Sequence, residues 1–382
     1  MKSVALGELV APAQVQRAGG GEYPVLSMTM HDGLVAQTER FKKRIASMDT
    51  SDYKVVKHGQ LVVGFPINEG VLDFQLRHAA AVVSPAYGIW DLRDESVVDR
   101  GYLKRFLKSP RAIEYYVSKM KGSTARRRSL PPVEFNAMPI PLPPLPEQRR
   151  IAAILDHADA LRVKRRQVLS HLDSLTHSVF HDMFGDPASN PRGVPSAPIG
   201  DLAAVVTGNS PSRADESNFG SSIEWIKSDN LGGDVATRAA EWLSERGRAK
   251  ARIAPSGSIL VTCIAGSPTS IGKASVVDRD VAFNQQINAI LPSARVNSAF
   301  LLGQLKAAPD LVRAKSTGGM KGLVNKSAFQ SIEVLSPPLD AQDKFASRLA
   351  AITTQAAATQ RALAAGDDLF ASLQSRAFRG EL

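Results

Sequence analysis

Two stretches of the chain place apolar residues at helical spacing over a long distance. In the first, apolar positions alternate three and four residues apart from Ile151 to Val179, with one polar interruption at Arg165. A heptad pattern kept over this length predicts a long helix that packs along another helix. We expect the helix to run from Glu147 to about Phe184, ~57 Å at ~1.5 Å per residue. Its expected seam consists of Ile151, Ile154, Leu161, Val168, Leu172, Leu175 and Val179.

The second stretch, near the end of the chain, is richer in alanine. Its expected seam consists of Phe345, Leu349, Ile352, Leu363, Phe370 and Leu373. We expect the two helices to form an intramolecular antiparallel pair, because a lone seam of this length needs an equally long partner. The alternative is that each helix packs only on its own globular block.

The two helices belong to an internal repeat. PPLPEQ at 143–148 has a counterpart in PPLDAQ at 337–342, which lies 194 residues later (337 minus 143). Further matches at nearly the same offset are Phe135 with Phe329, Phe184 with Phe378, and LGEL at 6–9 with IGDL at 199–202. Matched segments in the same order, about half a chain apart, indicate two copies of one plan and a pseudo-twofold internal repeat.

Each copy is expected to hold a globular block, a proline-rich hinge and a long helix. Short β-type runs at 60–65 and 258–264 are bounded by turn residues, and helical patches occur at 101–120 and 297–314. The blocks are therefore predicted to be α+β. The expected domains are 1–140 and 188–335 for the two blocks, 141–187 for the hinge and central helix, and 336–382 for the distal helix.

The composition indicates what kind of partner the protein binds. The 382 residues carry a formal net charge of +10 and a pI near 9.7, which favours a polyanionic partner. A single cysteine, Cys263, rules out an internal disulfide framework and a cysteine-based zinc site. No apolar run approaches the ~20 residues needed to cross a bilayer, and Met1–Val10 lacks a signal-peptide core. We therefore expect a cytoplasmic protein with no membrane partner.

Residue patterns for catalysis and metal binding are missing. The adenine-methyltransferase pattern Asn/Asp-Pro-Pro-aromatic does not occur, and the histidines lack a metalloprotease arrangement. The nearest approach to a phosphate-binding loop, 266–274, has one residue too many between its glycines, and Ala274 stands where a hydroxyl is needed. We expect no catalytic residue, no metal site and no cofactor in this chain.

Contacts to nucleic acid are expected at glycine-rich basic loops, where backbone amides approach phosphates and Lys or Arg supplies charge. The expected residues are Lys121, Ser123, Thr124, Arg126, Arg127 and Arg128 in the first block, and Gly318, Gly319 and Lys321 in the second. A third basic cluster lies at 162–166 on the first long helix. The alternative is that such charge runs are solvated faces.

Reading of bases requires amide and guanidinium side chains, Asn or Gln for adenine and Arg for guanine. The expected residues, all at turns of the second block, are Asn209, Ser210, Ser212, Arg213, Lys227, Asn230, Gln285, Gln286 and Asn288. The first block offers fewer amides, with Asn68 and Gln75 available. Such unequal chemistry at matched positions is expected of two readers of different sequences.

Several of these segments resemble one family, the specificity subunits of type I restriction–modification systems. PLPPLPEQRRIAAILDHADALRVKRRQVLSHLDSLTHSVFHDMFGDP at 141–187 resembles that family's central spacer, and 336–382, ending in RAFRGEL, its distal spacer. TGNSPS at 207–212, followed by WIKSDNL at 225–231, is similar to the opening of its target recognition domains. The first block lacks a segment matching TGNSPS, so the likeness assigns no recognition loop there.

The resemblance implies a non-catalytic, DNA-binding subunit. Family members use two recognition domains, held apart by antiparallel spacer helices, to read the halves of an interrupted double-stranded DNA site. Their spacers dock two methyltransferase subunits, which bind S-adenosylmethionine and methylate adenine at N6. A restriction complex adds two restriction/translocase subunits that use ATP and Mg.

Two alternatives stay open. One is the same subunit in a methyltransferase-only or other phage-defence assembly. The other is a coiled-coil adaptor whose globular blocks bind protein and not DNA.

Overall fold

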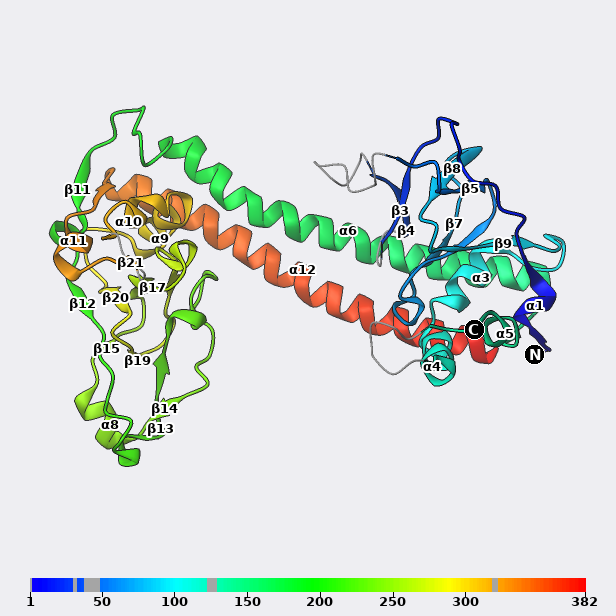
Figure 1. The fold of residues 1–382 in the computed structure, drawn as a ribbon. Helices are drawn as coiled ribbons and strands as arrows, with labels where there is room; N and C mark the ends of the chain where they lie inside the picture. The colour runs from blue at the N-terminus through cyan, green and yellow to red at the C-terminus, as the bar shows by residue number, and fades with distance from the viewer. Residues whose placement is uncertain (1, 30–32, 38–48, 122–128, 318–321) are drawn as a thin grey trace. The chain divides into compact units, whose positions relative to one another are not determined.

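The computed structural model describes residues 2–29, 33–37, 49–121, 129–317 and 322–382, without the side chain of residue 177. Two compact units divide the chain: unit 1 is Met1–Arg165 with Ala362–Leu382, and unit 2 is Arg166–Arg361. Two long helices, α6 (Leu145–Phe184) and α12 (Leu339–Arg379), each contribute one end to each unit (Figure 1). Helix α6 begins two residues before the predicted Glu147 and ends at the predicted Phe184.

Unit 1 combines short strands with helices, and its largest described sheet is antiparallel with the order β2-β9-β6-β7. Three two-stranded sheets, β1-β10, β3-β4 and β5-β8, complete it. Its strands are β1 (Ser3–Ala5), β2 (Val10–Pro12), β3 (Leu26–Thr29), β4 (Gly33–Ala36), β5 (Lys54–Lys57), β6 (Leu61–Val63), β7 (Leu72–Phe74), β8 (Ala80–Val83), β9 (Gly88–Leu92) and β10 (Pro139–Pro141). Its shorter helices are α1 (Leu6–Leu9), α3 (Arg100–Leu107), α4 (Pro110–Lys119) and α5 (Pro132–Asn136).

Unit 2 has the antiparallel sheet β12-β20-β16-β18 and a second four-stranded sheet, β14-β13-β19-β15, in which β13 and β19 run parallel. The pairs β11-β22 and β17-β21 complete it. Its strands are β11 (Ser196–Pro198), β12 (Val205–Thr207), β13 (Phe219–Ile226), β14 (Trp242–Leu243), β15 (Ile253–Ala254), β16 (Ile259–Thr262), β17 (Ile264–Ala265), β18 (Ala274–Val276), β19 (Val281–Phe283), β20 (Ile287–Ile290), β21 (Gly322–Leu323) and β22 (Glu333–Leu335). Its shorter helices are α7 (Ile199–Leu202), α8 (Glu245–Lys250), α9 (Ser298–Ala307), α10 (Asp310–Arg313) and α11 (Lys326–Gln330).

The mixed strand and helix content fits the predicted α+β class. Each predicted helical patch, however, is two helices. The patch at 101–120 divides because Ser109 caps α4 and Pro110 takes its first turn, while Pro309 starts α10 after the end of α9. No helix among the described residues is both long enough and apolar enough to cross a membrane.

Both blocks are closed by pairing their first strand with their last. Strand β1 pairs antiparallel with β10, and β11 with β22. The helix that follows each first strand has a glycine as its second residue, and this glycine packs on the end of another helix. A Cβ at Gly7 would lie 3.1 Å from the Asn136 side chain, and one at Gly200 would lie 3.1 Å from Gln330. The matched LGEL and IGDL segments of the sequence are therefore the sites of this closure.

One glutamine in the first turn of each long helix fastens that helix to its block. Gln148 is fully buried, accepts from the backbone N–H of Asp99 at 2.8 Å and donates to Pro143 O at 2.9 Å. Gln342, 1% exposed, accepts from the backbone N–H of Asn297 at 2.9 Å and donates to Pro337 O at 2.8 Å. Asp99 and Asn297 are the N-caps of α3 and α9. We call each of these arrangements the glutamine latch.

Aromatic rings pack the C-terminal end of each long helix into the core of a unit. Phe378, near the end of α12, meets Phe106 of α3 edge-on with ring centroids 5.0 Å apart. Phe184, at the end of α6, meets Phe300 of α9 in the same way at 5.0 Å. All four rings are buried, in the core of unit 1 and of unit 2 respectively.

In unit 1 a charged contact also joins the two long helices. Arg162 of α6 donates to Asp367 of α12 at 2.6 Å and to Asp159 at 2.9 Å. Its guanidinium lies 4.3 Å from the Phe370 ring centroid, and Arg105 of α3 faces the same ring at 5.7 Å. Arg162 of the basic run at 162–166 is therefore paired with carboxylates within the protein.

Replacing Gln148 or Gln342 by alanine should lower the free energy of unfolding of the affected unit by about 1–3 kcal/mol, because buried backbone groups lose their partners. Denaturant-dependent hydrogen exchange of the first amides of α3 and α9 measures the loss in each unit. Arg149→Ala, at the exposed neighbouring position, is the matched control. An equal loss in that control would contradict the glutamine latch.

Candidate nucleic-acid interface

The loops that carry the second-block candidates leave one edge of a sheet in unit 2. Strands β13 and β19 pair in parallel, so the loops that follow them emerge side by side. Ser228 Oγ, after β13, donates to Gln286 Oε1, after β19, at 3.4 Å. Ser210, from the loop before β13, donates to Gln285 Oε1. Residues that are up to 76 positions apart in sequence (286 minus 210) thus form one surface, which we call the loop edge.

Two cations share one aromatic ring at the loop edge. The guanidinium carbon of Arg213 lies 5.6 Å, and Nζ of Lys227 5.0 Å, from the Trp225 ring centroid. Both also pair with Glu241, with Arg213 Nη2 2.9 Å from its Oε2. The hydrogen bond from Lys227 lowers the pKa of Glu241, as does that from Arg213. Two positive charges against one carboxylate leave this cluster cationic, and 65% of the Arg213 side chain is exposed.

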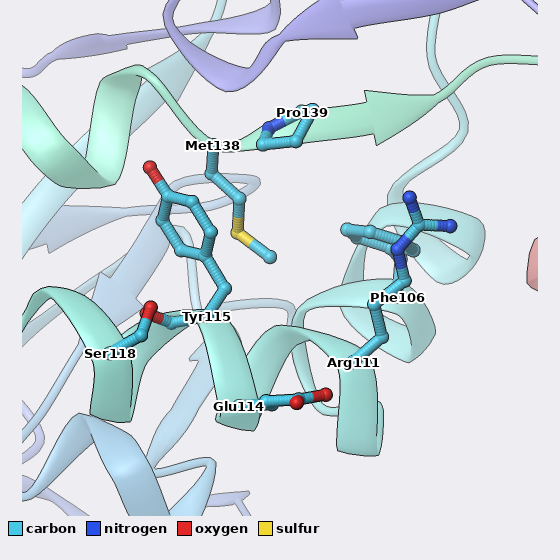
Figure 2. Close-up of a pocket in the computed structure, with 7 residues that line it drawn as sticks. All are labelled: Phe106, Arg111, Glu114, Tyr115, Ser118, Met138 and Pro139. Carbon is cyan, nitrogen blue, oxygen red and sulfur yellow. The ribbon is translucent and has the colours of Figure 1, made fainter.

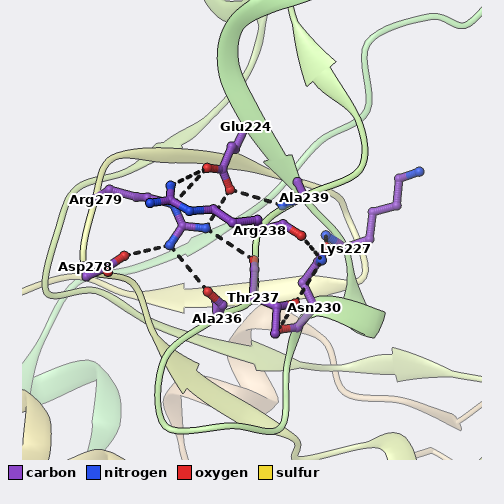
Figure 3. Close-up of polar contacts among 9 residues, drawn as sticks. All are labelled: Glu224, Lys227, Asn230, Ala236, Thr237, Arg238, Ala239, Asp278 and Arg279. Atoms are coloured by element: carbon purple, nitrogen blue, oxygen red, sulfur yellow. Dashed lines mark hydrogen bonds and ion pairs between the residues drawn. The ribbon is translucent and has the colours of Figure 1, made fainter. Parts of the chain in front are cut away.

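A buried carboxylate organises the adjoining loop (Figure 3). Glu224 of β13 is 3% exposed, and Arg279 donates to both its oxygens, at 2.6 and 3.0 Å. Arg238 Nη1 donates to Oε1 at 2.6 Å, and the Ala239 backbone N–H donates to Oε2 at 3.1 Å. Burial raises the pKa of Glu224, but these hydrogen bonds, led by those from Arg279, outweigh it and hold the pKa at about 2.

Two of the predicted base-reading asparagines instead hold loops in place. Asn230 Oδ1 accepts from the Lys227 backbone N–H at 3.0 Å, and its Nδ2 donates to Arg238 O at 3.1 Å. Asn209 uses its amide similarly, accepting from Arg252 N at 2.8 Å and donating to the carbonyl of residue 250 at 2.8 Å. Short amide side chains at turns readily bond to nearby backbone, and this role competes with base reading.

The structure does not support Asn288 as a surface contact. It lies in β20, is 1% exposed, accepts from Thr207 Oγ1 at 2.6 Å and donates to Cys263 Sγ at 3.2 Å. The sequence prediction took 284–288 as one turn, whereas strand β20 already begins at Ile287. The same burial raises the pKa of the Cys263 thiol to about 12, which leaves that thiol unreactive.

The remaining described candidates of the second block reach the surface. Ser210, Ser212, Arg213 and Gln285 are exposed, whereas Lys227 and Gln286 are half-buried. Lys121 of the first block is also exposed, and it pairs with Ser129 through two backbone hydrogen bonds of 3.0 Å. The predicted Ser123, Thr124, Arg126, Arg127, Arg128, Gly318, Gly319 and Lys321 lie outside the described residues.

The predicted seam residues differ in exposure along the helices. The buried ones are Ile151, Leu363 and Phe345. The partly buried ones are Ile154, Leu172, Val179, Leu349, Ile352, Phe370 and Leu373. The exposed ones are Leu161, Val168 and Leu175, at 40, 41 and 42%. In unit 1, Leu161 and the 56% exposed Leu369 line a largely apolar groove of about 460 Å³.

Another cavity in unit 1, of about 280 Å³, lies between α3, α4 and the start of β10 (Figure 2). Three of its polar side chains donate to backbone carbonyls. Tyr115 donates to Glu134 O at 2.9 Å, Ser118 to Tyr115 O at 2.8 Å, and Arg111 to Phe378 O at 3.4 Å. Among the described residues, no group of three or more His, Cys, Asp or Glu is placed to hold a metal ion.

Sequence reasoning missed Glu224, Arg238 and Arg279. One signal was present, because Glu224 interrupts the apolar run Ile223–Ile226 of a strand. A carboxylate at such a position needs cationic partners. Nothing in the spacing says which arginines supply them, since 238 and 279 are 14 and 55 residues away.

Acid should remove the stabilisation that ionised Glu224 provides. Its folded pKa of about 2 lies below the ordinary value of 4.5, so the stabilisation is complete above about pH 5 and declines as the pH falls toward 2. The difference in unfolding free energy between wild type and Glu224→Gln should shrink over that range and stay constant above it. Denaturant titrations at a series of pH values test this, with exposed Glu216→Gln as the control for loss of one charge. A difference that persists unchanged to pH 2 would contradict it.

Comparison with known proteins finds similar sequences and similar folds. Residues 191–365 match the type I restriction modification DNA specificity domain. The chain is 29% identical over 153 residues to the type I restriction enzyme HindI specificity subunit of Haemophilus influenzae. That match covers 38% of this chain and only 32% of the relative's length.

Solved structures share the fold across nearly the whole chain. A chain from work on complex assembly and conformational transition of the type I R-M system has a TM-score of 0.62 at 17% identity, covering 100% of this chain and 98% of its own. The type I restriction-modification S subunit from M. genitalium has a TM-score of 0.59 at 11% identity, covering 99% and 96%. The comparisons therefore show a match to the type I restriction modification DNA specificity domain at residues 191–365, and a fold shared with solved structures across nearly the whole chain.

Proposed function

We propose that this chain is the non-catalytic subunit that gives a type I restriction–modification enzyme its DNA sequence specificity. The observation that carries the proposal is the loop edge of unit 2. There, Arg213 and Lys227 stack on Trp225, and Gln285 and Gln286 lie on the adjoining loop. Cations suit phosphates and guanine, amides suit adenine, and the surface falls within the matched specificity domain.

Each globular block reads one half of a bipartite, asymmetric DNA site. The matched closures at Gly7 and Gly200 and the two glutamine latches support a pseudo-twofold plan, with one reader in each copy. The cationic cluster at Trp225 belongs to the second block, so the two readers present different chemistry. Different chemistry at matched positions gives an asymmetric site.

The two long helices form an antiparallel spacer pair that docks two methyltransferase subunits and, in a restriction complex, two restriction/translocase subunits. Contacts within unit 1 support the antiparallel direction. Arg162 pairs with Asp367, while the earlier Leu155 shares a core cluster with the later Phe378. S-adenosylmethionine, ATP and Mg are held by the partners. The exposed apolar residues of the helices, Leu369 above all, supply the docking surface.

A genome-wide map of N6-methyladenine, with and without this gene, tests the function. We expect methylation to disappear at one interrupted, asymmetric motif when the gene is removed. Exchange of residues 188–335 for those of another family member should change one half of the motif and leave the other half unchanged. An unaltered map, with the cognate methyltransferase active, would refute the specificity role, and a change in both halves would refute independent readers.

Leu369→Asp should weaken binding of the methyltransferase partner by tenfold or more, because it places a charge in the apolar groove of unit 1. Ala364→Asp is the matched control. It is also exposed on α12, and five residues at ~100° each place it about 140° around the helix from Leu369. Titration of the purified chain with the methyltransferase measures both. Equal weakening by both variants would place the docking surface elsewhere.

A further inference from the structure

The loop that carries Arg238 is fixed in position before any ligand arrives. Arg279, besides pairing with Glu224, donates to the backbone carbonyls of residues 236 and 237 at 3.4 and 3.2 Å. Asn230 donates to the carbonyl of Arg238 itself at 3.1 Å, and Glu224 accepts from the next backbone N–H at 3.1 Å. The main chain on both sides of Arg238 is therefore held by buried or half-buried side chains (Figure 3).

The side chain of Arg238 is tethered at one point and otherwise open. Its Nη1 bonds to Glu224 Oε1, yet 71% of the side chain is exposed. Among the described residues, its Nε and Nη2 make no hydrogen bond to the protein. The free edge of the guanidinium thus keeps the two-pronged donor geometry that arginine uses for planar, two-acceptor partners.

Glu224 does not need Arg238 to have both of its oxygens bonded. Arg279, whose side chain is only 18% exposed, already donates to both of them. Arg279 also donates to Asp278 at 2.6 Å, so the two arginines face two carboxylates, of which only Glu224 is buried. A structural role would be filled by Arg279 alone, whereas a tethered and exposed second arginine is what a pre-oriented ligand contact needs. Ordering it in advance removes rotamer freedom that binding would otherwise have to remove.

We propose that Arg238 determines specificity by donating from Nε and Nη2 to O6 and N7 of a guanine in the major groove, and that Glu224 is the positioning residue that orients it. This rests on the proposed DNA-reading function. Guanine is favoured over phosphate because a phosphate contact needs only a positive charge that can reach it, and Arg213 and Lys227 supply such charges nearby. A contact to the edge of a base also requires that the two donors of the guanidinium point in a fixed direction.

The test uses the full chain in complex with its methyltransferase and a duplex bearing the motif found by methylation mapping. Each guanine of the half-site read by the second block is replaced singly by 7-deazaguanine, which lacks the N7 acceptor. In wild type we expect one replacement to weaken binding strongly. Arg238→Ala should weaken binding to the unmodified duplex by roughly 5- to 150-fold and abolish the penalty at that one guanine.

Three variants separate orientation from charge. Arg238→Lys keeps the charge but lacks the planar fork and the tether geometry, so it should reduce the penalty at the 7-deazaguanine position while the non-specific salt dependence is retained. Glu224→Gln should reduce the penalty at the same guanine, and Arg238→Lys carries the test alone if Glu224→Gln fails to fold. Arg248→Ala removes another exposed arginine of unit 2 and is the matched control, expected to leave every penalty unchanged.

The outcomes distinguish the two proposals. If wild type binds its motif specifically but Arg238→Ala retains every 7-deazaguanine penalty, the guanine contact is refuted and the specificity function stands. If no duplex is bound specifically by the wild-type complex, the proposed function itself fails. A uniform loss of affinity for all duplexes in Arg238→Ala would assign Arg238 to phosphate and likewise refute the guanine contact.

Discussion

The buried glutamine at the start of each long helix is the contact on which the placement of each block depends. A primary amide offers both a donor and an acceptor, so it satisfies a hinge carbonyl and a cap N–H at once. Glutamate would lack the donor and leucine would lack both. Since Asp99 and Asn297 are themselves helix caps, the glutamine latch ties three elements together: the hinge, the long helix and the first helix that packs on it. Each block is thereby held at a defined orientation to its own helix segment.

In unit 2 a second constraint acts on the loops themselves. Glu224 lies in a strand between Ile223 and Trp225, both at most 5% exposed, so its charge requires nearby cations. Arg238 and Arg279 supply them, and Arg279 also bonds to carbonyls of the loop that carries Arg238. The demand of one buried charge therefore fixes the conformation of a surface loop. Burial of the strand and the conformation of this loop depend on the same few hydrogen bonds.

The sequence predicted the parts of the fold that repeat. The 194-residue offset, the helix ending at Phe184 and the proline segments before Gln148 and Gln342 were all readable, because local pattern and repetition encode them. The exposure of the residues in the middle of the seam could not be predicted from the sequence. A heptad pattern states which residues share a helix face, but exposure depends on how closely the partner approaches. Leu161, Val168 and Leu175 keep about two-fifths of their surface because blocks cover only the helix ends.

The candidate site shows why residue type alone misassigns roles. Asparagines were predicted to read bases, yet Asn209 and Asn230 hold backbone, and the side chain that their loops present is a cation. The same division recurs in unit 1. Gln75, the first-block amide noted in the sequence, is fully buried, accepts from the backbone N–H of Arg77 at 2.6 Å and donates to His78 O at 2.6 Å, while Arg77 is exposed.

A short amide can bond the backbone of its own turn, whereas a guanidinium on a longer stem reaches past it. In both units the amide therefore shapes the loop and the adjoining arginine faces outward.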